Sequence, residues 1–263
     1  MVPTQPPLGP GRHLLTHRVA SFMEAASKQA GQRWSDSPSC TDELIATLAR
    51  GVNNALSSET RPRLAALVPL VIGLHADDPR WHSWVVMHVA STTVPVAPES
   101  QQRSLAVAIL SAARSLRSFA PLGLADGGPP LDREGLTLGV RQAFAAVPLA
   151  RAWAEGFANA HLGLVKHEGP HPYNMLAGKA VMNAAVYALS NGSNEDRDGL
   201  LIDLLTSTVL AARTWSGMPE DDTDVMTFDW SSRSTGSHAL RHPWLRSAQA
   251  TGLRPYGSPG SRR

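Results

Sequence analysis

The chain has 263 residues, of which 43% are hydrophobic and 17% charged, and its formal net charge is +2. This balance, without any block of like charge, is typical of a folded domain and excludes a disordered chain. The 24 basic residues are mostly arginines spread along the chain rather than gathered on one stripe with aromatic residues, so we do not expect nucleic-acid binding. The longest apolar run, Leu64–Leu74, contains Pro69 and is too short to span a membrane, so we expect no membrane partner.

Apolar residues recur at three- and four-residue spacing along most of the chain, which predicts a series of helices. In chain order, the patterns predict helices over about His13–Gln32, from Ser39 or Thr41 to Ser57, and over Thr60–Leu74, Asp78–Ser91, Pro98–Phe119, Asp132–Val147, Trp153–Val165, Pro172–Ser190 and Asp196–Ser216. Asp78 and Pro79 fit the N-cap and first turn of their helix, and Pro148 ends or kinks the helix before it. The wide apolar stripe of Thr60–Leu74 predicts a central helix.

No strand-like alternation persists over five residues, and no internal repeat is present. We therefore predict an all-α fold, an irregular multi-helix bundle of about nine or ten helices. Proline and glycine gather over 121–131, which allows a subdomain break there. The predicted organisation is a flexible segment over 1–12, a helical domain over 13–250 and a flexible tail over 251–263.

The single cysteine and the N-terminal segment bear on stability and location. Cys40 cannot form an intramolecular disulfide or a multi-cysteine zinc site, because it has no second cysteine to join. It precedes a predicted helix, so it is either a thiolate with a lowered pKa or, as we favour, a small buried hydrophobic residue near the cap. Residues Met1–Gly11 lack the pattern of a signal peptide, which predicts a cytoplasmic location.

The strongest candidate for a catalytic site is the loop that contains His167, Glu168, His171 and Tyr173. Two prolines restrict its backbone, so these side chains would be oriented at a junction of helices, where clefts form. A histidine beside a carboxylate can act as a general acid or base near neutral pH. The alternative is a polar interhelical loop, with His171 beside a helix N-cap and Tyr173 hydrogen-bonded at the surface.

Two further histidine pairs, His13 with His17 and His238 with His242, each fit one side of a helix and would bind zinc only if other ligands joined them. Neighbouring arginines disfavour a cation, so we interpret both pairs as solvated helix faces. The acidic run Glu220–Asp224 invites comparison with the magnesium site of helical terpene synthases, but the second metal-binding motif is missing, which favours a solvated loop. We assign no metal site and expect no cofactor.

Seven tryptophans stand beside only three tyrosines and five phenylalanines. Such rings bury large areas while keeping one N–H donor, so they suit both protein cores and ligand pockets. Trp81, Trp84, His88 and Trp153 are the predicted ligand-binding residues. The competing interpretation places such rings in the core, which helical spacing favours for Trp153 and Trp215.

The stretch from Ser39–Cys40 through Arg61–Leu64 to Ile72–Gly73, followed by the Ala/Trp-rich helix around Arg151–Ala154, resembles helical proteins of high-G+C bacteria that carry no assigned activity. The resemblance consists of apolar spacing and a helix-start pattern rather than catalytic residues. It implies a bacterial, cytosolic, all-helical protein and brings no activity with it.

These observations predict a soluble helical protein with an interhelical pocket for a small molecule or peptide, acting as a binding or tailoring component of a specialised bacterial pathway. The sequence leaves open whether it is an enzyme; for catalysis, His167 or His171 with Glu168 would supply acid–base chemistry. The alternative is a non-catalytic interaction protein that buries a helical face against a partner or, as a homo-oligomer, against itself. The third hypothesis is metal-dependent catalysis, in which several of the histidines and the acidic run Glu220–Asp224 would together bind the metal ion.

Overall fold

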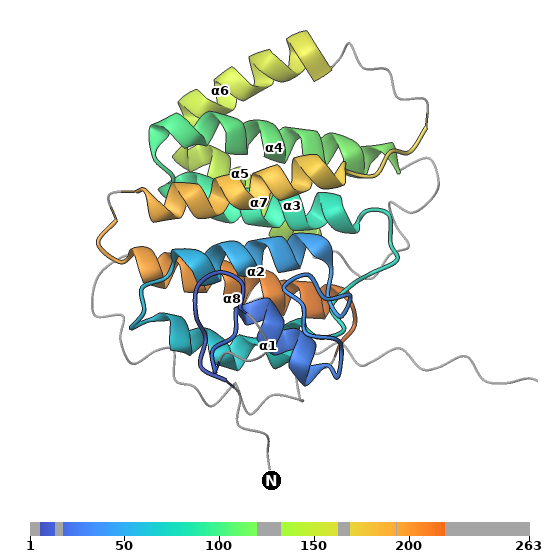
Figure 1. Cartoon of the computed structure of the whole chain (residues 1–263). Helices are drawn as coiled ribbons and strands as arrows, with labels where there is room; N and C mark the ends of the chain where they lie inside the picture. The colour runs from blue at the N-terminus through green and yellow to red at the C-terminus, as the bar shows by residue number, and fades with distance from the viewer. Residues whose placement is uncertain (1–5, 14–17, 120–132, 163–168, 193, 219–263) are drawn as a thin grey trace, which may run out of the picture.

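The structure is a computed structural model that describes residues 6–13, 18–119, 133–162, 169–192 and 194–218. These residues form eight α-helices (Figure 1). The helices are α1 (Phe22–Gln29), α2 (Glu43–Ala55), α3 (Trp81–Thr93), α4 (Glu99–Ser118), α5 (Arg133–Ala146), α6 (Pro148–Phe157), α7 (Met175–Ser190) and α8 (Arg197–Trp215). Shorter turns are the 3₁₀ segments η1 (Arg61–Leu67), η2 (Pro69–Val71) and η3 (Val94–Val96) and the π-helical turn η5 (Ala158–Leu162). Isolated β-bridges but no strands occur in these residues, so the prediction of an all-α, irregular multi-helix bundle is confirmed.

Some predicted boundaries fall outside the described residues. These are the tail over 251–263 and the break over 121–131. Part of the predicted N-terminal segment is described and lies against α2, where the Asn53 side chain donates to the Gly9 carbonyl at 2.9 Å and the Gly11 N–H donates to Asn54 at 2.8 Å.

Side-chain caps fix the starts of several helices. Ser21 and Glu24 form a reciprocal capping box at α1, and Asn174 and Asp196 cap α7 and α8. At α2 the cap is Asp42 rather than either predicted residue, because its carboxylate accepts two backbone N–H groups of the first turn. Each cap satisfies donors that the helix itself leaves unpaired.

The predicted helix over Thr60–Leu74 is wrong. The chain forms the two 3₁₀ turns η1 and η2 there, because Pro69 has no N–H to continue a helix and Gly73 reverses the chain at φ 78°. Apolar spacing gave the correct buried residues, since Leu64 and Leu67 are buried, but not the conformation. The central position belongs to α2.

Two predicted helix starts are also corrected. The first helix begins at Phe22 rather than near His13, because the capping box starts it there. The Asp78 carboxylate does not cap α3; it accepts from the backbone and guanidinium of Arg80, and the helix starts at Trp81. The helix break predicted at Pro148 is confirmed, with α5 ending just before it and α6 starting on it.

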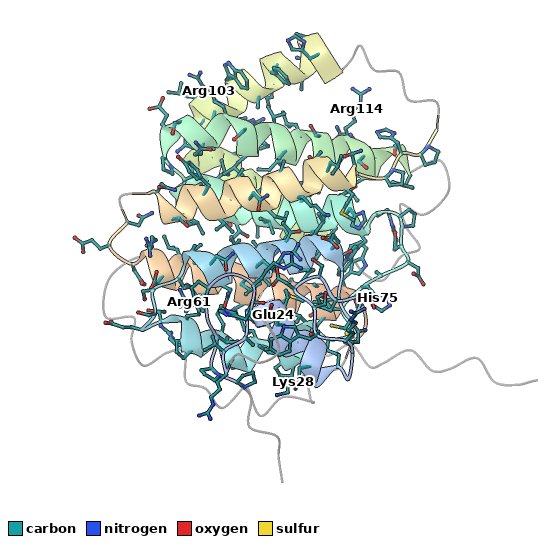
Figure 2. The ribbon with its side chains drawn as sticks, in the orientation of Figure 1. Glu24, Lys28, Arg61, His75, Arg103 and Arg114 are labelled. Carbon is teal, nitrogen blue, oxygen red and sulfur yellow. The ribbon has the colours of Figure 1, made fainter. Side chains whose placement is uncertain are left out.

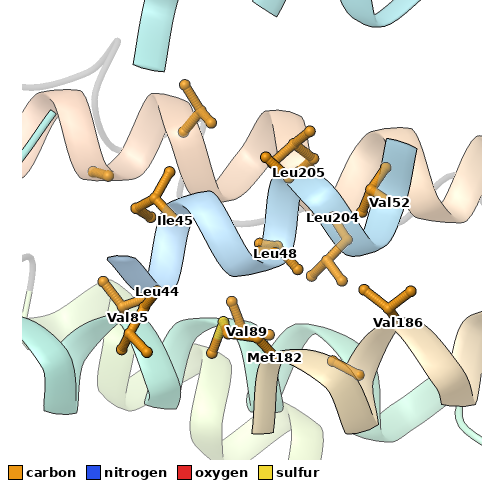
Figure 3. Packing of buried hydrophobic residues seen from close by; sticks show 14 of the residues in the cluster. Leu44, Ile45, Leu48, Val52, Val85, Val89, Met182, Val186, Leu204 and Leu205 are labelled. Atoms are coloured by element: carbon orange, nitrogen blue, oxygen red, sulfur yellow. The ribbon is translucent and has the colours of Figure 1, made fainter. Parts of the chain in front are cut away.

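The hydrophobic core surrounds α2, whose apolar side chains contact helices on two sides. Figure 3 shows residues of α2 between those of α8 and those of α3 and α7: Leu44, Ile45, Leu48, Val52, Leu204, Leu205, Val85, Val89, Met182 and Val186. The buried cluster includes residues from both sides of the segment over 120–132, so the two halves of the chain share one core.

Helices α6 and α4 lie at the top of the bundle in Figure 1, and α3, α5 and α7 lie below them. The turn η3 joins α3 to α4, and the hydroxyl of Ser83 near the start of α3 donates to that of Ser115 near the end of α4 at 2.8 Å. Helix α6 covers α4 and runs in the same direction, tilting away toward its C-terminal end (Figure 1). This tilt positions the groove described below.

Candidate functional site

The loop predicted as catalytic is fastened to α4 through its backbone. The His171 N–H donates to the Ser118 hydroxyl at 3.0 Å, and the Ser115 hydroxyl donates to the His171 carbonyl at 2.7 Å. His167 and Glu168 lie outside the described residues. The structure therefore places one half of the predicted constellation at the C-terminal end of α4.

The side chains of this loop have different surroundings. The His171 ring is half-buried, and its Nδ1 lies 3.3 Å from the Gly169 carbonyl. Tyr173 packs against the core, and burial raises the pKa of its phenol to about 12. Its hydroxyl therefore stays protonated near neutral pH and could act as a donor but not as a base. Its packing against the core also differs from the alternative of a hydrogen-bonded surface tyrosine.

Three of the four predicted ligand-binding residues come together in the core. Trp84 lies 5.7 Å from Trp81, 5.5 Å from His88 and 5.2 Å from Trp215, measured between ring centroids. All four rings are at most 5% exposed, so they fill the space between α3 and α8 themselves. The prediction that Trp215 is a core residue is confirmed.

Trp153 lies elsewhere, and its assignment to the core is wrong. It is 43% exposed on α6, since it turns away from the buried Ala154. Its ring stacks on Phe157 at 5.4 Å, Phe157 contacts His161 at 4.6 Å, and the Arg103 guanidinium lies 5.6 Å from the Trp153 centroid. These aromatic side chains make a partly exposed ladder along α6 and η5.

A groove opens between α4 and the end of α6. It has a cavity volume of about 400 Å³, within the range of small-molecule sites. Three of its lining residues come from α4, one from α6 and two from η5: Leu110, Arg114, Arg117, Glu155, Ala158 and Asn159. The π-helical turn η5 contributes to the wall, and such turns often occur at functional sites.

The charge of the groove is positive. Arg114 and Arg117 lie on successive turns of α4, and Figure 2 shows Arg103 and Arg114 on the edge of α4 that faces α6. The one carboxylate in the lining, Glu155, pairs with Arg151 at 2.8 Å. The lining thus carries two guanidinium groups and one carboxylate.

The groove and the predicted loop meet on α4. Ser118, which holds the His171 backbone, is one helical turn after Arg114, and Ser115 directly follows Arg114. The described half of the loop is thus anchored beside the cationic end of the groove.

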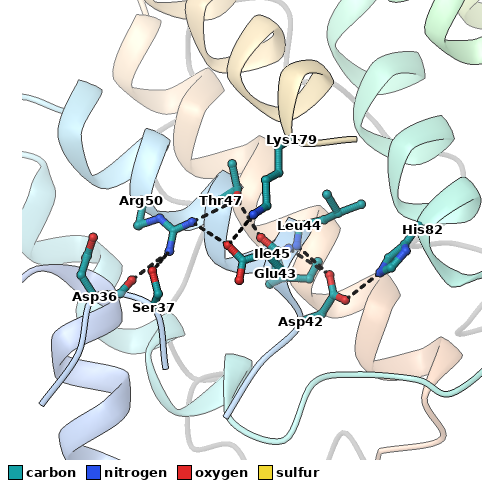
Figure 4. A network of polar contacts seen from close by, with 10 residues as sticks. All are labelled: Asp36, Ser37, Asp42, Glu43, Leu44, Ile45, Thr47, Arg50, His82 and Lys179. Carbon is teal, nitrogen blue, oxygen red and sulfur yellow. Dashed lines mark hydrogen bonds and ion pairs between the residues drawn. The ribbon is translucent and has the colours of Figure 1, made fainter. Parts of the chain in front are cut away.

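Other polar clusters in the described residues are structural. Figure 4 shows a network in which Arg50 binds Glu43 at 3.3 Å and Lys179 binds Glu43 at 3.0 Å, linking α2 to α7. In the same view, His82 lies 3.1 Å from Asp42 and links α3 to the start of α2. No group of three His, Cys, Asp or Glu side chains in the described ranges could hold a metal ion.

Of the remaining predicted features, Cys40 lies in the described residues, and several histidines and the acidic run do not. Cys40 is buried, and burial raises the pKa of its thiol, which confirms the buried-residue interpretation over a reactive thiolate. His17, His238, His242 and the run Glu220–Asp224 lie outside the described residues. In the described portion of the chain, no helix combines the length and apolar character that crossing a membrane requires.

Sequence reasoning missed the groove, although it left a signal. Arg103, Leu110, Arg114 and Arg117 follow one another at seven, four and three residues, the spacing of one helix face. By itself such a face is typical of a solvated surface. Its importance depends on the packing of α6 against it, which no local pattern encodes.

Comparisons with protein-family models, curated proteins and solved structures find no match.

Proposed function

We propose that this protein binds an anionic small molecule or peptide in the groove between α4 and α6. The observation that carries the proposal is the presence of two arginines beside two apolar residues, Leu110 and Ala158, in the lining of a cavity of about 400 Å³. Guanidinium groups bind carboxylates and phosphates with two parallel hydrogen bonds. Apolar side chains beside them favour a ligand that also carries an aromatic or aliphatic part.

The aromatic ladder extends this surface. Trp153 is exposed in the middle of α6, and Arg103 of α4 lies against its ring. A ligand longer than the cavity would therefore meet further aromatic area and a third arginine along the same side of α4. A peptide or an elongated metabolite fits this arrangement.

The test is a titration with a defined probe, 8-anilinonaphthalene-1-sulfonate, followed by fluorescence. Reversing both charges in Arg114→Glu/Arg117→Glu should weaken binding about tenfold or more, because it replaces two attractive contacts to the sulfonate by repulsive ones. The uncharged analogue N-phenyl-1-naphthylamine should lose little affinity, since it has no anionic group.

The matched control is Arg12→Glu/Arg33→Glu, which makes the same charge change at two exposed arginines near α1. Helix α1 lies on the opposite side of the bundle from α6 (Figure 1). Equal weakening by both variants would mean that the probe responds to overall charge, and the groove would be abandoned as the site.

Acid–base catalysis is the second part of the proposal. The specific observation in its favour is the anchoring of His171 to α4 beside the groove. A ligand held by Arg114 would then lie beside the loop that carries His171, and histidine is the side chain most often used as a general acid or base. Once a substrate is identified, His171→Ala should lower turnover while leaving ligand affinity within a factor of about three. Unchanged turnover in His171→Ala would contradict a catalytic role for His171, and only the ligand-binding part of the proposal would remain.

Non-catalytic association is the alternative function, and exposed apolar residues favour it. Leu176 and Tyr187 on α7 are 76% and 57% exposed, and Leu149 on α6 is 81% exposed. If this face of α7 is an interface, the wild-type protein should sediment as a dimer and the variant Leu176→Ser/Tyr187→Ser as a monomer in sedimentation velocity. A wild-type monomer at all accessible concentrations would exclude self-association through this face.

The wider setting completes the proposal. We infer a bacterial, cytoplasmic protein of a specialised pathway, on the basis of the resemblance to helical proteins of high-G+C bacteria. Ligand binding in the groove is compatible with a tailoring component of such a pathway.

A further inference from the structure

We propose that α7 binds α7 of a second copy of this chain, with the two helices antiparallel about a two-fold axis. The inference rests on the alternative function, association through α7, and deepens it by naming the arrangement of the helices and the residues that meet. Figure 1 shows α7 on the near face of the bundle, in front of α3, which it contacts. No residue of α7 lines the groove between α4 and α6, so the two surfaces are separate.

The exposed side of α7 carries no charged side chain. Its exposed residues are Leu176, Ala177, Ala180, Asn183 and Tyr187. The one charged residue of this helix, Lys179, reaches toward α2, where its ammonium binds the Glu43 carboxylate at 3.0 Å (Figure 4). A two-fold interface brings each surface against the same surface of the second copy, so an exposed charge would meet a like charge. The uncharged side of α7 avoids this repulsion.

A second exposed apolar surface, on α6, suits such an interface less well. Leu149 is 81% exposed there, but Arg103 lies 5.6 Å from the centroid of the nearby Trp153 ring. Arg151 is also exposed on α6. Facing its own copy, this surface would bring arginines together, whereas interface cores are depleted in charged residues. Of these two surfaces, α7 is therefore the one that two copies can share.

The spacing of the exposed residues on α7 defines how the two copies meet. Leu176, Ala180, Asn183 and Tyr187 follow one another at four, three and four residues, so they form one stripe along the helix. When two such stripes lie antiparallel, Leu176 meets Tyr187 of the second copy and Ala180 meets Asn183. Large side chains then pack together at both ends, while smaller ones in the middle let the helices approach closely.

The size of this contact predicts how tightly the copies bind. Helix α7 has 16 residues, so it is about 24 Å long and about 10 Å wide. One face of it is smaller than the surface of about 800 Å² that each partner buries in a standard interface. We therefore expect a reversible dimer that forms at micromolar concentrations and not a permanent one.

The test introduces charges at the two ends of the stripe and measures dimerisation by sedimentation velocity between about 1 and 100 μM. Leu176→Glu and Tyr187→Lys each place a charge against an apolar side chain of the second copy, so each should weaken dimerisation about tenfold or more. In the antiparallel pair the double variant Leu176→Glu/Tyr187→Lys brings opposite charges together at both ends. It should therefore dimerise at least about threefold more tightly than either single variant.

The matched control is Leu149→Glu, which introduces the same charge at an exposed leucine of α6 and should leave the dimer unchanged. A wild-type monomer at every concentration, or equal weakening by Leu149→Glu, would overturn both this inference and the alternative function. A wild-type dimer that weakens further in the double variant than in either single one would overturn the antiparallel pair alone, because parallel helices bring like charges together. The anion titration of the groove is independent of these results.

Discussion

Asp42 is the residue on which the start of α2 and its connection to α3 both depend. Burial by itself raises the pKa of this carboxyl, but the hydrogen bond and charge of His82 and the N–H groups of Leu44 and Ile45 outweigh it. The pKa of Asp42 therefore lies below its ordinary value in the folded protein. A carboxyl with a lowered folded pKa stabilises the fold above its unfolded pKa, and this stability is lost as the pH falls toward the folded pKa.

Asp42→Asn should accordingly lower the free energy of unfolding by about 1 kcal/mol at pH 7, because the amide keeps a capping oxygen but loses the charge. The deficit relative to wild type should shrink as the pH falls below about 4, where the wild-type carboxylate itself becomes protonated. Urea unfolding at several pH values measures both. A deficit that stays constant down to pH 3 would contradict the lowered pKa; Asp77→Asn, at an exposed site, should show no such pH dependence.

Cys40 should be an unreactive thiol. Its side chain is buried and its raised pKa keeps it protonated, so iodoacetamide at pH 8 should modify the folded protein at least about tenfold more slowly than the same protein in urea. Mass spectrometry of timed samples measures the two rates. Similar rates would mean that the thiol is open to solvent in the folded state.

Among elements, the contact of α7 with α2 depends on Gly178. A Cβ there would lie 2.8 Å from Cδ2 of Leu44, so this fully buried side chain would have to shift against its neighbours. Gly156 on α6 is the natural control, because a Cβ at that position meets no atom within 4 Å.

The two glycines predict effects of opposite sign. Gly178→Ala should destabilise the protein by about 1–2 kcal/mol through overpacking. Gly156→Ala should stabilise it by about 0.5–1 kcal/mol, because alanine favours a helix over glycine. Both are measured by urea unfolding; stabilisation by Gly178→Ala would show that α7 does not pack this closely on α2.

Helix patterns in the sequence predicted most of these elements but not all their conformations. The strict spacing of Leu105, Ile109 and Ala112 identified α4, and all three are buried. The helix predicted over Thr60–Leu74 was wrong because apolar spacing indicates only which residues are buried. Pro69 and Gly73 decide whether the backbone can continue as a helix.

At the scale of the whole molecule, a single core joins both halves of the chain. Buried residues before 120 and after 132 belong to the same cluster, and α2 contacts α7 and α8. We therefore expect far-UV circular dichroism and tryptophan fluorescence to follow one common urea transition. Two separate transitions would mean that the chain contains independently folding parts.

The site shows where prediction from sequence stopped. His171 and Tyr173 were identified from their loop, and the structure places that loop against α4. Arg114 and Arg117 were not identified from the sequence, because the charged face of α4 forms one wall of a groove only when α6 and η5 pack beside it. Similarly, Trp81 and Trp84 were predicted to bind a ligand, but they lie in the core because α8 packs against them, and this long-range contact is not visible in the local sequence.

The most direct measurement of the central claim is a backbone NMR titration of the ¹⁵N-labelled protein with 8-anilinonaphthalene-1-sulfonate. Binding in the groove predicts that the largest chemical-shift changes fall on residues 110–117 of α4 and 155–159 of α6 and η5, and that they disappear in Arg114→Glu/Arg117→Glu. Changes centred on the exposed face of α7, or persisting in that variant, would contradict an anion-binding groove between α4 and α6.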